Sequence, residues 1–435
     1  MYQGIKTVSF EEAVKVVKSG DRIHIHSVAC APQGLIQALC NRGRAGELKD
    51  VKLQHLHTEG SAPYAEAEFE GIFFLESYFV GSNVRKPTQE GYADYVPIHL
   101  SETQKLIRSG IHPVDVAMIQ VCPPDKHGFV SMGTSVDATL AAVQNAKTVI
   151  AVINPNVPRA WGDAIIKLSD IDIFCEDDTP LIEAHPATLT EQDIAIGKNV
   201  ASLIEDGATL QMGIGAIPNA VLSQLGNHKN LGIHTEMFAD GVLPLYEKGV
   251  VNNMNKKFDK GKIVSTFLMG SKKVYDFIDD NPGVAMMDVG YTNDPFIIAQ
   301  QPKMTAINSA LSVDITGQVN ADSLGIKFYS GSGGQLGFIR GAAASEGGKP
   351  IIALPAVTNK GVSKICPTLL NGAGVVTTRF DVHYVVTEFG IANLYGKTLQ
   401  ERAKTLINIA HPDHRETLDK AAFERFGSHY HFISK

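Results

Sequence analysis

A glycine turn and a single glutamate that follows it in the chain carry most of the chemical information in this sequence. The turn is Gly213-Ile214-Gly215, and the glutamate is Glu236, in the run His234-Thr235-Glu236. A carboxylate can act as a nucleophile, because a covalent intermediate divides one difficult transfer into easier steps. Backbone N–H groups beside it can stabilise the oxyanion that develops. The two features predict nucleophilic chemistry if the fold brings them to one crevice.

Two strands and a helix are expected to position these groups. Residues 208–212 read as a short strand that enters the turn, Pro218 opens an apolar helical pattern, and residues 231–235 read as a second strand. Proline suits the first helical position, because its missing N–H would be unpaired there anyway. Parallel strands joined by a right-handed crossover have their carboxyl ends at one sheet edge, where open α/β sheets bind ligands. The turn and Glu236 are therefore expected to lie close together.

Length and composition limit the classes of protein to consider. The chain has 435 residues, 44% of them hydrophobic and 20% charged, with a net charge of −7. That length predicts at least two domains, and the negative charge argues against nucleic-acid binding. No apolar run approaches the roughly 20 residues of a membrane span, and the N-terminus lacks the apolar core of a secretory signal. Five scattered cysteines without a CxxC pair indicate reduced thiols and no structural zinc, so we expect a cytoplasmic protein.

The sequence contains a diverged internal duplication. Residues 10–39 and 196–225 both show a helical pattern, a strand, a turn of small residues, a proline and a second helix. This predicts two similar open α/β domains with mainly parallel sheets, one over residues 1–186 and one over residues 187–435. The first copy has Ser27-Val28-Ala29 where the second has the glycine turn. We therefore expect the chemistry in the second domain.

A second glycine-dense segment spans residues 330–350. Its closely spaced glycines allow the backbone to approach a ligand, and a helix over residues 338–345 is expected to follow. Arg340 in that helix suits a carboxylate or phosphate, although a structural ion pair is the simpler interpretation. The sequence leaves two interpretations of this segment open, a source of backbone donors and a surface loop.

Two histidine pairs raise the possibility of a metal. His24 and His26, and likewise His55 and His57, would point to one face of a strand. No further set of histidine and aspartate ligands at later strand ends completes such a site. We therefore predict no bound metal.

Five motifs together resemble those of the class I CoA-transferases, in the branch of 4-hydroxybutyrate CoA-transferase and acetyl-CoA hydrolase/transferase. They are GIGAIPNAV, GIHTEMFADG, GYTNDP, GGQLGFIRGA and VVTEFGIANLYGK, which begin at residues 213, 232, 290, 333 and 385. The resemblance spans nearly the whole chain and implies the CoA-transferase fold, with Glu236 as the nucleophile. It also implies that CoA contacts Gly213, Ile214, Gly215, Ala216, Ile217, Leu311 and Gly334. Gly337 departs from the family pattern, which has an aspartate there.

The resemblance implies transfer of CoA between short-chain acids, with 4-hydroxybutyrate or butyrate exchanging with acetate. The reaction would proceed through a glutamyl-CoA thioester in a ping-pong mechanism, with acyl-CoA and carboxylates as substrates and no tightly bound cofactor. A homodimer is expected for the family. The sequence leaves open an acyl-CoA hydrolase that uses the same glutamate, a catalytically silent CoA-binding protein and, less favoured, a metal hydrolase built on the histidine pairs.

Overall fold

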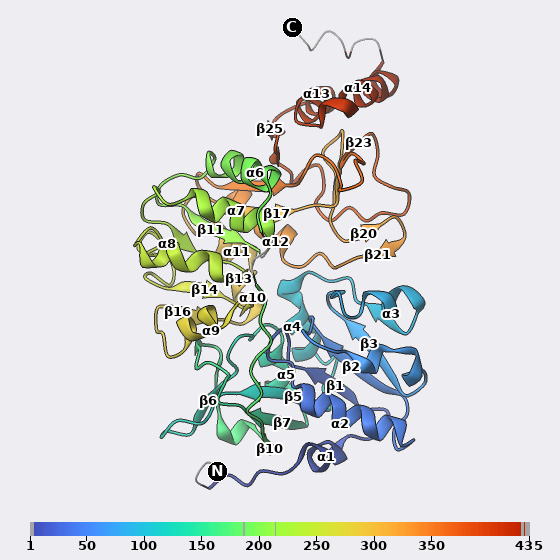
Figure 1. Cartoon of the computed structure of the whole chain (residues 1–435), viewed down its shortest axis with the longest axis vertical. Helices are drawn as coiled ribbons and strands as arrows, with labels where there is room; N and C mark the ends of the chain where they lie inside the picture. Colours follow the sequence, from blue (N-terminus) through green and yellow to red (C-terminus); the bar gives the residue numbers. More distant parts are fainter. Residues whose placement is uncertain (1–3, 186–187, 214, 428–429, 431–435) are drawn as a thin grey trace. The chain divides into compact units, whose positions relative to one another are not determined.

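The computed structural model describes residues 4–185, 188–213, 215–427 and 430 (Figure 1). Contacts between residues divide the chain into two compact units. One comprises residues 1–185 and 262–292, and the other comprises residues 186–261 and 293–435. By its contacts, segment 262–292 belongs to the first unit. The predicted single boundary after residue 186 does not include this return of the chain to the first unit. That single boundary stays a prediction.

The first unit is built on a seven-stranded sheet with the order β10-β7-β5-β1-β2-β3-β4, drawn in blue to green in Figure 1. All of its neighbouring strands are parallel. Central strands of such a sheet are covered on both faces and become nearly continuously apolar, as in the fully buried β5, where Gln120 is the one polar residue. The strands are β1 (Arg22–Ile25), β2 (Val51–His55), β3 (Phe73–Ser77), β4 (Ala93–Tyr95), β5 (Val116–Val121), β7 (Thr148–Ile153) and β10 (Ile173–Glu176).

Helices and smaller sheets complete the first unit. Its helices are α1 (Phe10–Ala13), α2 (Gln33–Arg44), α3 (Arg85–Glu90), α4 (Leu100–Arg108), α5 (Thr139–Asn145), α9 (Lys272–Ile278) and α10 (Val289–Thr292). Its shorter strands are β6 (Phe129–Ser131), β8 (Trp161–Gly162), β9 (Ile165–Lys167), β14 (Ile263–Ser265), β15 (Phe267–Leu268) and β16 (Val284–Met286). Strand β6 pairs with β9, and β16 lies between β14 and β8.

The second unit is built on a six-stranded sheet with the order β12-β11-β17-β22-β24-β25. Its strands are parallel except β25, which forms an antiparallel hairpin with β24. The strands are β11 (Thr209–Met212), β12 (Gly232–Ile233), β17 (Thr305–Ser309), β22 (Lys349–Ala353), β24 (Tyr384–Thr387) and β25 (Gly390–Asn393).

The helices of the second unit are α6 (Glu191–Ala201), α7 (Ala216–Gln224), α8 (Leu243–Glu247), α11 (Pro295–Ala299), α12 (Gln335–Ala344), α13 (Leu399–Asn408) and α14 (Pro412–Phe426). Its shorter strands are β13 (Met237–Phe238), β18 (Ser312–Asp314), β19 (Val319–Asn320), β20 (Ser323–Leu324), β21 (Lys327–Phe328) and β23 (Ile365–Cys366). Short 3₁₀ turns over the two units are Val14–Val16, Pro63–Ala65, Ala67–Phe69, Leu168–Asp170 and Asp240–Val242.

The two sheets repeat one topology, which confirms the predicted fold class. The order β10-β7-β5-β1-β2 in the first unit corresponds to β24-β22-β17-β11-β12 in the second. In the first unit β2 lies on one side of β1 and β5 on its other side, and in the second unit β12 lies on one side of β11 and β17 on its other side. The copies therefore place β1 and β11, and likewise β2 and β12, at equivalent positions. Among the described residues, no helix is long and apolar enough to cross a membrane.

Element boundaries differ from the sequence expectation near the glycine segments. Helix α7 begins at Ala216, so Pro218 lies within its first turn and not at its first position. Strand β12 covers two residues of the expected 231–235. Helix α12 begins at Gln335, three residues before the expected start at residue 338. The glycine-dense segment thus runs directly into a helix.

Candidate active site

The strand that leads to the glycine turn and the segment that contains Glu236 are bonded to each other. Strands β11 and β12 pair in parallel, with Leu210 opposite Ile233. Beyond that pair, the Thr235 hydroxyl accepts a hydrogen bond from the Met212 N–H at 3.2 Å and donates to the Met212 carbonyl at 2.8 Å. Met212 directly precedes the turn, and Thr235 directly precedes Glu236. The fold therefore brings the turn and the glutamate to the same sheet edge.

Two donors hold the Glu236 carboxylate. The Asn293 Nδ2 amide donates to Oε2 of Glu236 at 2.7 Å, and the backbone N–H of Gly334 donates to the same carboxylate. A Cβ atom at position 334 would overlap Oε2 of Glu236 and Nδ2 of Asn293. Gly334 has φ −90° and ψ 5°, values that other residues adopt, so this steric overlap is what requires glycine. Glycine lets the main chain approach the carboxylate closely enough to donate.

Burial alters the acidity of Glu236. Removal from solvent raises its pKa to about 7, and the hydrogen bonds from Asn293 and Gly334 act in the opposite direction by stabilising the charged form. A carboxylate with limited solvation and two fixed donors is suited to nucleophilic attack, because little solvent must reorganise as its charge moves. Perturbed carboxyl groups of this kind are typical of functional sites.

The glycine turn is open to a ligand. A Cβ atom at Gly213 or at Gly215 would meet no heavy atom within 4 Å. Gly215 has φ +118° and precedes α7 without any side-chain cap, so the first N–H groups of that helix are available to an acceptor. Ala216 is half-buried and Ile217 is buried, which leaves their main chain as the part able to contact a ligand. Ile214, which the sequence also assigned to CoA, lies outside the described residues.

The remaining predicted contact, Leu311, lies between β17 and β18 and is half-buried. Its backbone N–H already donates to the carbonyl of Asn320 at 2.9 Å, which leaves its carbonyl and side chain for a ligand. Gln335, next to Gly334, donates from Nε2 to the Ser309 carbonyl at 2.7 Å and accepts from the Thr377 hydroxyl at 3.1 Å. Gln335 thus fixes the start of α12, where Gly334 lies, to the end of β17.

Sequence reasoning missed Asn293 and Gln335 as members of this site. Both occur in quoted motifs, GYTNDP and GGQLGFIRGA. No local pattern marks an asparagine that donates to a glutamate far away in the chain, so the motif itself was the available signal. Arg340 is exposed and pairs with Asp381 at 3.9 Å, which agrees with the structural interpretation of that residue.

The histidine pairs lie in the interior of the first unit. Nε2 of His24 contacts the Thr139 hydroxyl at 3.0 Å, and Nε2 of His55 contacts the Tyr64 hydroxyl at 2.9 Å. His26 contacts the Ser135 carbonyl through Nε2 at 2.8 Å. Burial lowers the pKa of His24 and His57 to about 4 and that of His55 to about 3. Within the described residues, no group of three His, Cys, Asp or Glu side chains could hold a metal ion.

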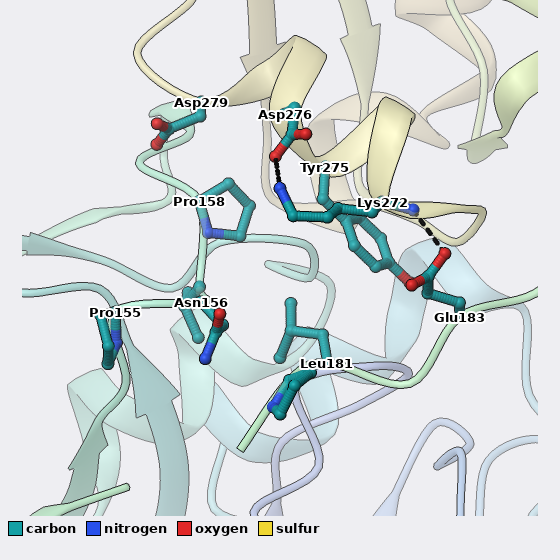
Figure 2. Close-up of a pocket in the computed structure, with 11 residues that line it drawn as sticks. Pro155, Asn156, Pro158, Leu181, Glu183, Lys272, Tyr275, Asp276 and Asp279 are labelled. Carbon is teal, nitrogen blue, oxygen red and sulfur yellow. Dashed lines mark hydrogen bonds and ion pairs between the residues drawn. The ribbon is translucent and has the colours of Figure 1, made fainter. Parts of the chain in front are cut away.

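A small pocket in the first unit, shown in Figure 2, is lined by none of the predicted site residues. It has a volume of about 130 Å³, below the few hundred Å³ of typical ligand pockets. Its polar groups bond to each other: the Lys272 N–H donates to Glu183 at 2.7 Å, and the Lys272 ammonium pairs with Asp276 at 2.5 Å. Prolines 155 and 158 form part of its wall. This pocket is therefore not a candidate for a ligand as large as CoA.

Comparison with known proteins agrees with the geometry. Residues 2–183 match the acetyl-CoA hydrolase/transferase N-terminal domain, and residues 270–422 match the corresponding C-terminal domain. The chain is 53% identical to a succinyl-CoA:acetate/propanoyl-CoA:succinate CoA transferase of Fasciola hepatica, over 95% of this chain and 87% of that protein. It is 47% identical to a 4-hydroxybutyrate coenzyme A transferase of Clostridium kluyveri, over 97% and 98%.

A similar solved structure covers both units. RipA from Yersinia pestis has a TM-score of 0.92 and 36% identity, with 97% of each chain covered. The family resemblance inferred from the five sequence motifs is thereby confirmed. This chain belongs to the acetyl-CoA hydrolase/transferase family of CoA-transferases.

Proposed function

We propose that this protein transfers CoA between short-chain carboxylic acids, with Glu236 as the covalent nucleophile. The observation that carries the proposal is a half-buried glutamate with two fixed donors, in the segment after a strand that adjoins an open glycine turn. The names of the two relatives include succinate, acetate, propanoate and 4-hydroxybutyrate as acyl groups. We propose acids of this size, among them 4-hydroxybutyrate or butyrate with acetate, as the exchanged substrates.

In the first half-reaction, a carboxylate oxygen of Glu236 attacks the thioester carbonyl of an acyl-CoA. The C–S bond breaks, and CoA leaves as the thiolate while an acyl-glutamyl anhydride forms. The thiolate then attacks the glutamyl carbonyl, the anhydride C–O bond breaks, and the free carboxylate of the first acid departs. The product on the enzyme is a glutamyl-CoA thioester on Glu236.

In the second half-reaction, the carboxylate of the acceptor acid attacks the glutamyl thioester and expels the CoA thiolate. A new anhydride forms, and the thiolate attacks its acyl carbonyl to give the new acyl-CoA and to restore the Glu236 carboxylate. Each attack on the glutamyl carbon develops an oxyanion on the carboxyl group that Asn293 and Gly334 contact. Preorganised donors of this type commonly contribute ~10²–10³-fold in rate.

CoA is proposed to bind along the main chain of the glycine turn, at residues 213–217, with further contacts near Gly334 and Leu311. The open space at Gly213 and Gly215 and the uncapped start of α7 support this assignment. Binding energy from the remote part of CoA can be used to align the reacting atoms. No tightly bound cofactor takes part in the proposed steps. A homodimer in the cytoplasm stays a prediction.

A hydrolase is the second candidate, because the family model covers hydrolases as well as transferases. In that reaction water attacks the same glutamyl thioester, releases CoA and restores Glu236. The two activities share every step up to the thioester. They differ in whether the site admits water at that point.

The test is a transfer assay with acetyl-CoA as donor and butyrate, 4-hydroxybutyrate, succinate or propanoate as acceptor, with free CoA measured in parallel. Formation of the new acyl-CoA, and its loss in Glu236→Gln, would support the transferase. CoA release that is independent of the acceptor would indicate the hydrolase. Wild-type turnover by Glu236→Gln would refute the proposed mechanism.

A further inference from the structure

We propose that Thr235 is a positioning residue that links the CoA-binding turn to the nucleophile. Through its hydroxyl, occupation of the turn at residues 213–217 would fix the geometry of Glu236 for attack. This inference rests on the proposed function and adds to it the route by which CoA binding aligns the reacting carboxylate.

The regular ladder between β11 and β12 is replaced by a side chain at this point. The His234 N–H donates to the Leu210 carbonyl at 3.1 Å, as in a parallel pair. In a regular parallel ladder, the next bond would run from the Met212 N–H to the carbonyl of residue 234. Here that N–H donates to the Thr235 hydroxyl at 3.2 Å. At Met212, the strand that enters the turn is therefore joined to the segment that carries Glu236 through the Thr235 hydroxyl group.

The hydroxyl of Thr235 has two acceptors for one proton. It lies 2.8 Å from the Met212 carbonyl, before the turn, and 2.9 Å from the Met237 carbonyl, directly after Glu236. The side chain is fully buried, so water does not compete for these bonds. A movement of Met212 that weakens one bond favours the other. The hydroxyl thus connects the backbone on both sides of the nucleophile to the start of the turn.

The backbone just upstream is held independently. Oδ1 of Asn253 accepts from the Ile233 N–H at 2.8 Å, and the buried Lys256 donates from Nζ to the Ile233 carbonyl at 2.9 Å. Both backbone groups of Ile233 are therefore held by side chains. A shift of the turn is not absorbed at Ile233, and beyond the bond from the His234 N–H to the Leu210 carbonyl the next connection along the chain is Thr235.

The equivalent threonine of the first copy does not make this link. Thr58 follows β2 as Thr235 follows β12, and its hydroxyl contacts Tyr64 at 3.3 Å and the Asn83 amide at 3.2 Å. There the main chain joins the strands directly, because the Val28 N–H donates to the His57 carbonyl at 2.8 Å and the Glu59 N–H donates to the Val28 carbonyl at 3.1 Å. The hydroxyl link is thus particular to the copy that carries the open turn.

The test compares Thr235→Val with Thr235→Ser, using acetyl-CoA and the truncated donor acetyl-pantetheine, which lacks the nucleotide part of CoA. Thr235→Val should lower kcat with acetyl-CoA by ~10- to 100-fold, the loss expected when a reacting group is misplaced by about 1 Å. The loss with acetyl-pantetheine should be much smaller, since that donor gains little from the turn. Thr235→Ser should restore the wild-type ratio between the two donors.

The chain supplies a matched control in Thr387. This buried threonine ends strand β24 of the same sheet, and its hydroxyl donates to the Ile409 carbonyl at 2.6 Å and accepts from the Phe389 N–H at 3.1 Å. Thr387→Val loses similar bonds away from the turn, so it should lower the stability without changing the ratio between the donors. If Thr235→Val does not fold, Thr235→Cys replaces it, because a thiol is a weak donor in a small side chain.

Equal losses with both donors, or no loss, in the valine or cysteine variant would overturn the role of Thr235. That result is distinct from failure of the proposed function, which would appear as retained turnover in Glu236→Gln. An inactive Glu236→Gln together with a wild-type donor ratio in Thr235→Val would reject only the positioning role.

Discussion

The same three residues, His-Thr-Glu, follow equivalent strands in the two copies. Residues 57–59 follow β2, and residues 234–236 follow β12. Burial raises the pKa of both Glu59 and Glu236. Only Glu236 has the Asn293 amide and the Gly334 N–H as fixed donors, whereas Glu59 lies 3.9 Å from the His57 ring. The tripeptide alone therefore does not define a nucleophile, and the donors around it distinguish the two sites.

The turns after β1 and β11 also differ between the two copies, in how much of their main chain is already bonded. Val28 of the first copy adopts φ +56°, which is unusual for a β-branched residue, and its side chain is fully buried. Its N–H is already bonded to His57. In the second copy, Gly213 and Gly215 have open space where a side chain would lie. The main chain of the first turn is bonded across the sheet, and that of the second turn borders open space.

The largest expected effect on activity is the difference between substitution of Glu236 and substitution of Glu59. Glu236→Gln should remove transfer by at least ~10³-fold, because an amide cannot form the anhydride. Glu59→Gln, the matched change in the first copy, should still form the covalent intermediate. Single-turnover release of acetate from acetyl-CoA, with CoA retained on the protein, measures both. Comparable residual activity in the two variants would show that the copies do not differ as described.

The next effect concerns the backbone donor. Gly334→Ala should lower kcat by ~10²–10³-fold, because the added methyl group overlaps the carboxylate and displaces a donor. The backbone there is not strained, so the fold should survive, which circular dichroism can check. Gly226→Ala is the control, since a Cβ at Gly226 meets nothing within 4 Å. Similar kinetics for both alanine variants would contradict the role of Gly334.

A smaller effect tests the open turn. Gly213→Val should raise KM for acetyl-CoA by ~10- to 100-fold, because a side chain would occupy the space left for the ligand. Gly213 is a cleaner site for this test than Gly215, whose φ of +118° would strain any substituted residue. Gly226→Val provides the control. Unchanged affinity for CoA in Gly213→Val would assign the turn a purely structural role.

Titratable groups in the two copies should also change the stability of the protein in opposite directions as pH varies. Burial lowers the pKa of the four histidines of the first unit, so their contribution to stability is present above pH 6.5 and is lost as pH falls toward about 4. Thermal melting across this range should show a falling Tm. His55→Gln should reduce that fall, because one fewer buried group must gain a proton. A Tm independent of pH between 7 and 5 would be inconsistent with buried neutral histidines.

The contribution of Glu236 to stability should change with pH in the opposite direction to that of the histidines. This is the smallest of the expected effects. Its pKa is raised to about 7 from 4.5, so its contribution to stability is present below pH 4.5 and is lost as pH rises through 7. Glu236→Gln should therefore gain about 1 to 3 kcal/mol of stability relative to wild type at alkaline pH and little at acidic pH. Denaturant unfolding at both pH values measures the difference. A constant difference would mean that Glu236 titrates as an exposed carboxyl group.

The main elements of the fold were predictable because their signals are local. The duplicated strand, turn and helix pattern identified two mainly parallel sheets, and the crossover rule placed the end of β11 beside the end of β12. Exact boundaries were less predictable, since tertiary contacts and not propensity determine where α7 and α12 begin. The interleaving of residues 262–292 with the first unit depends on long-range packing that no local pattern encodes.

The site residues were predictable only where residue type and spacing in the sequence are distinctive. Glu236 and the glycine turn stood out by residue type and spacing. Asn293 and Gln335 did not, because an amide that donates to a distant partner looks the same as any surface amide. Thr235 was likewise hidden: its hydroxyl matters because the ladder beside it is interrupted, a fact visible only in three dimensions.

The central claim is that Glu236 forms a covalent thioester with CoA. The most direct measurement is the intact mass of the protein after incubation with acetyl-CoA, followed by borohydride reduction and peptide mapping, with Glu236→Gln in parallel. A CoA-sized adduct, and conversion of the Glu236 carboxyl group to an alcohol in the wild type alone, is the predicted result. An unmodified Glu236 under turnover conditions, or the same adduct in Glu236→Gln, would contradict the mechanism.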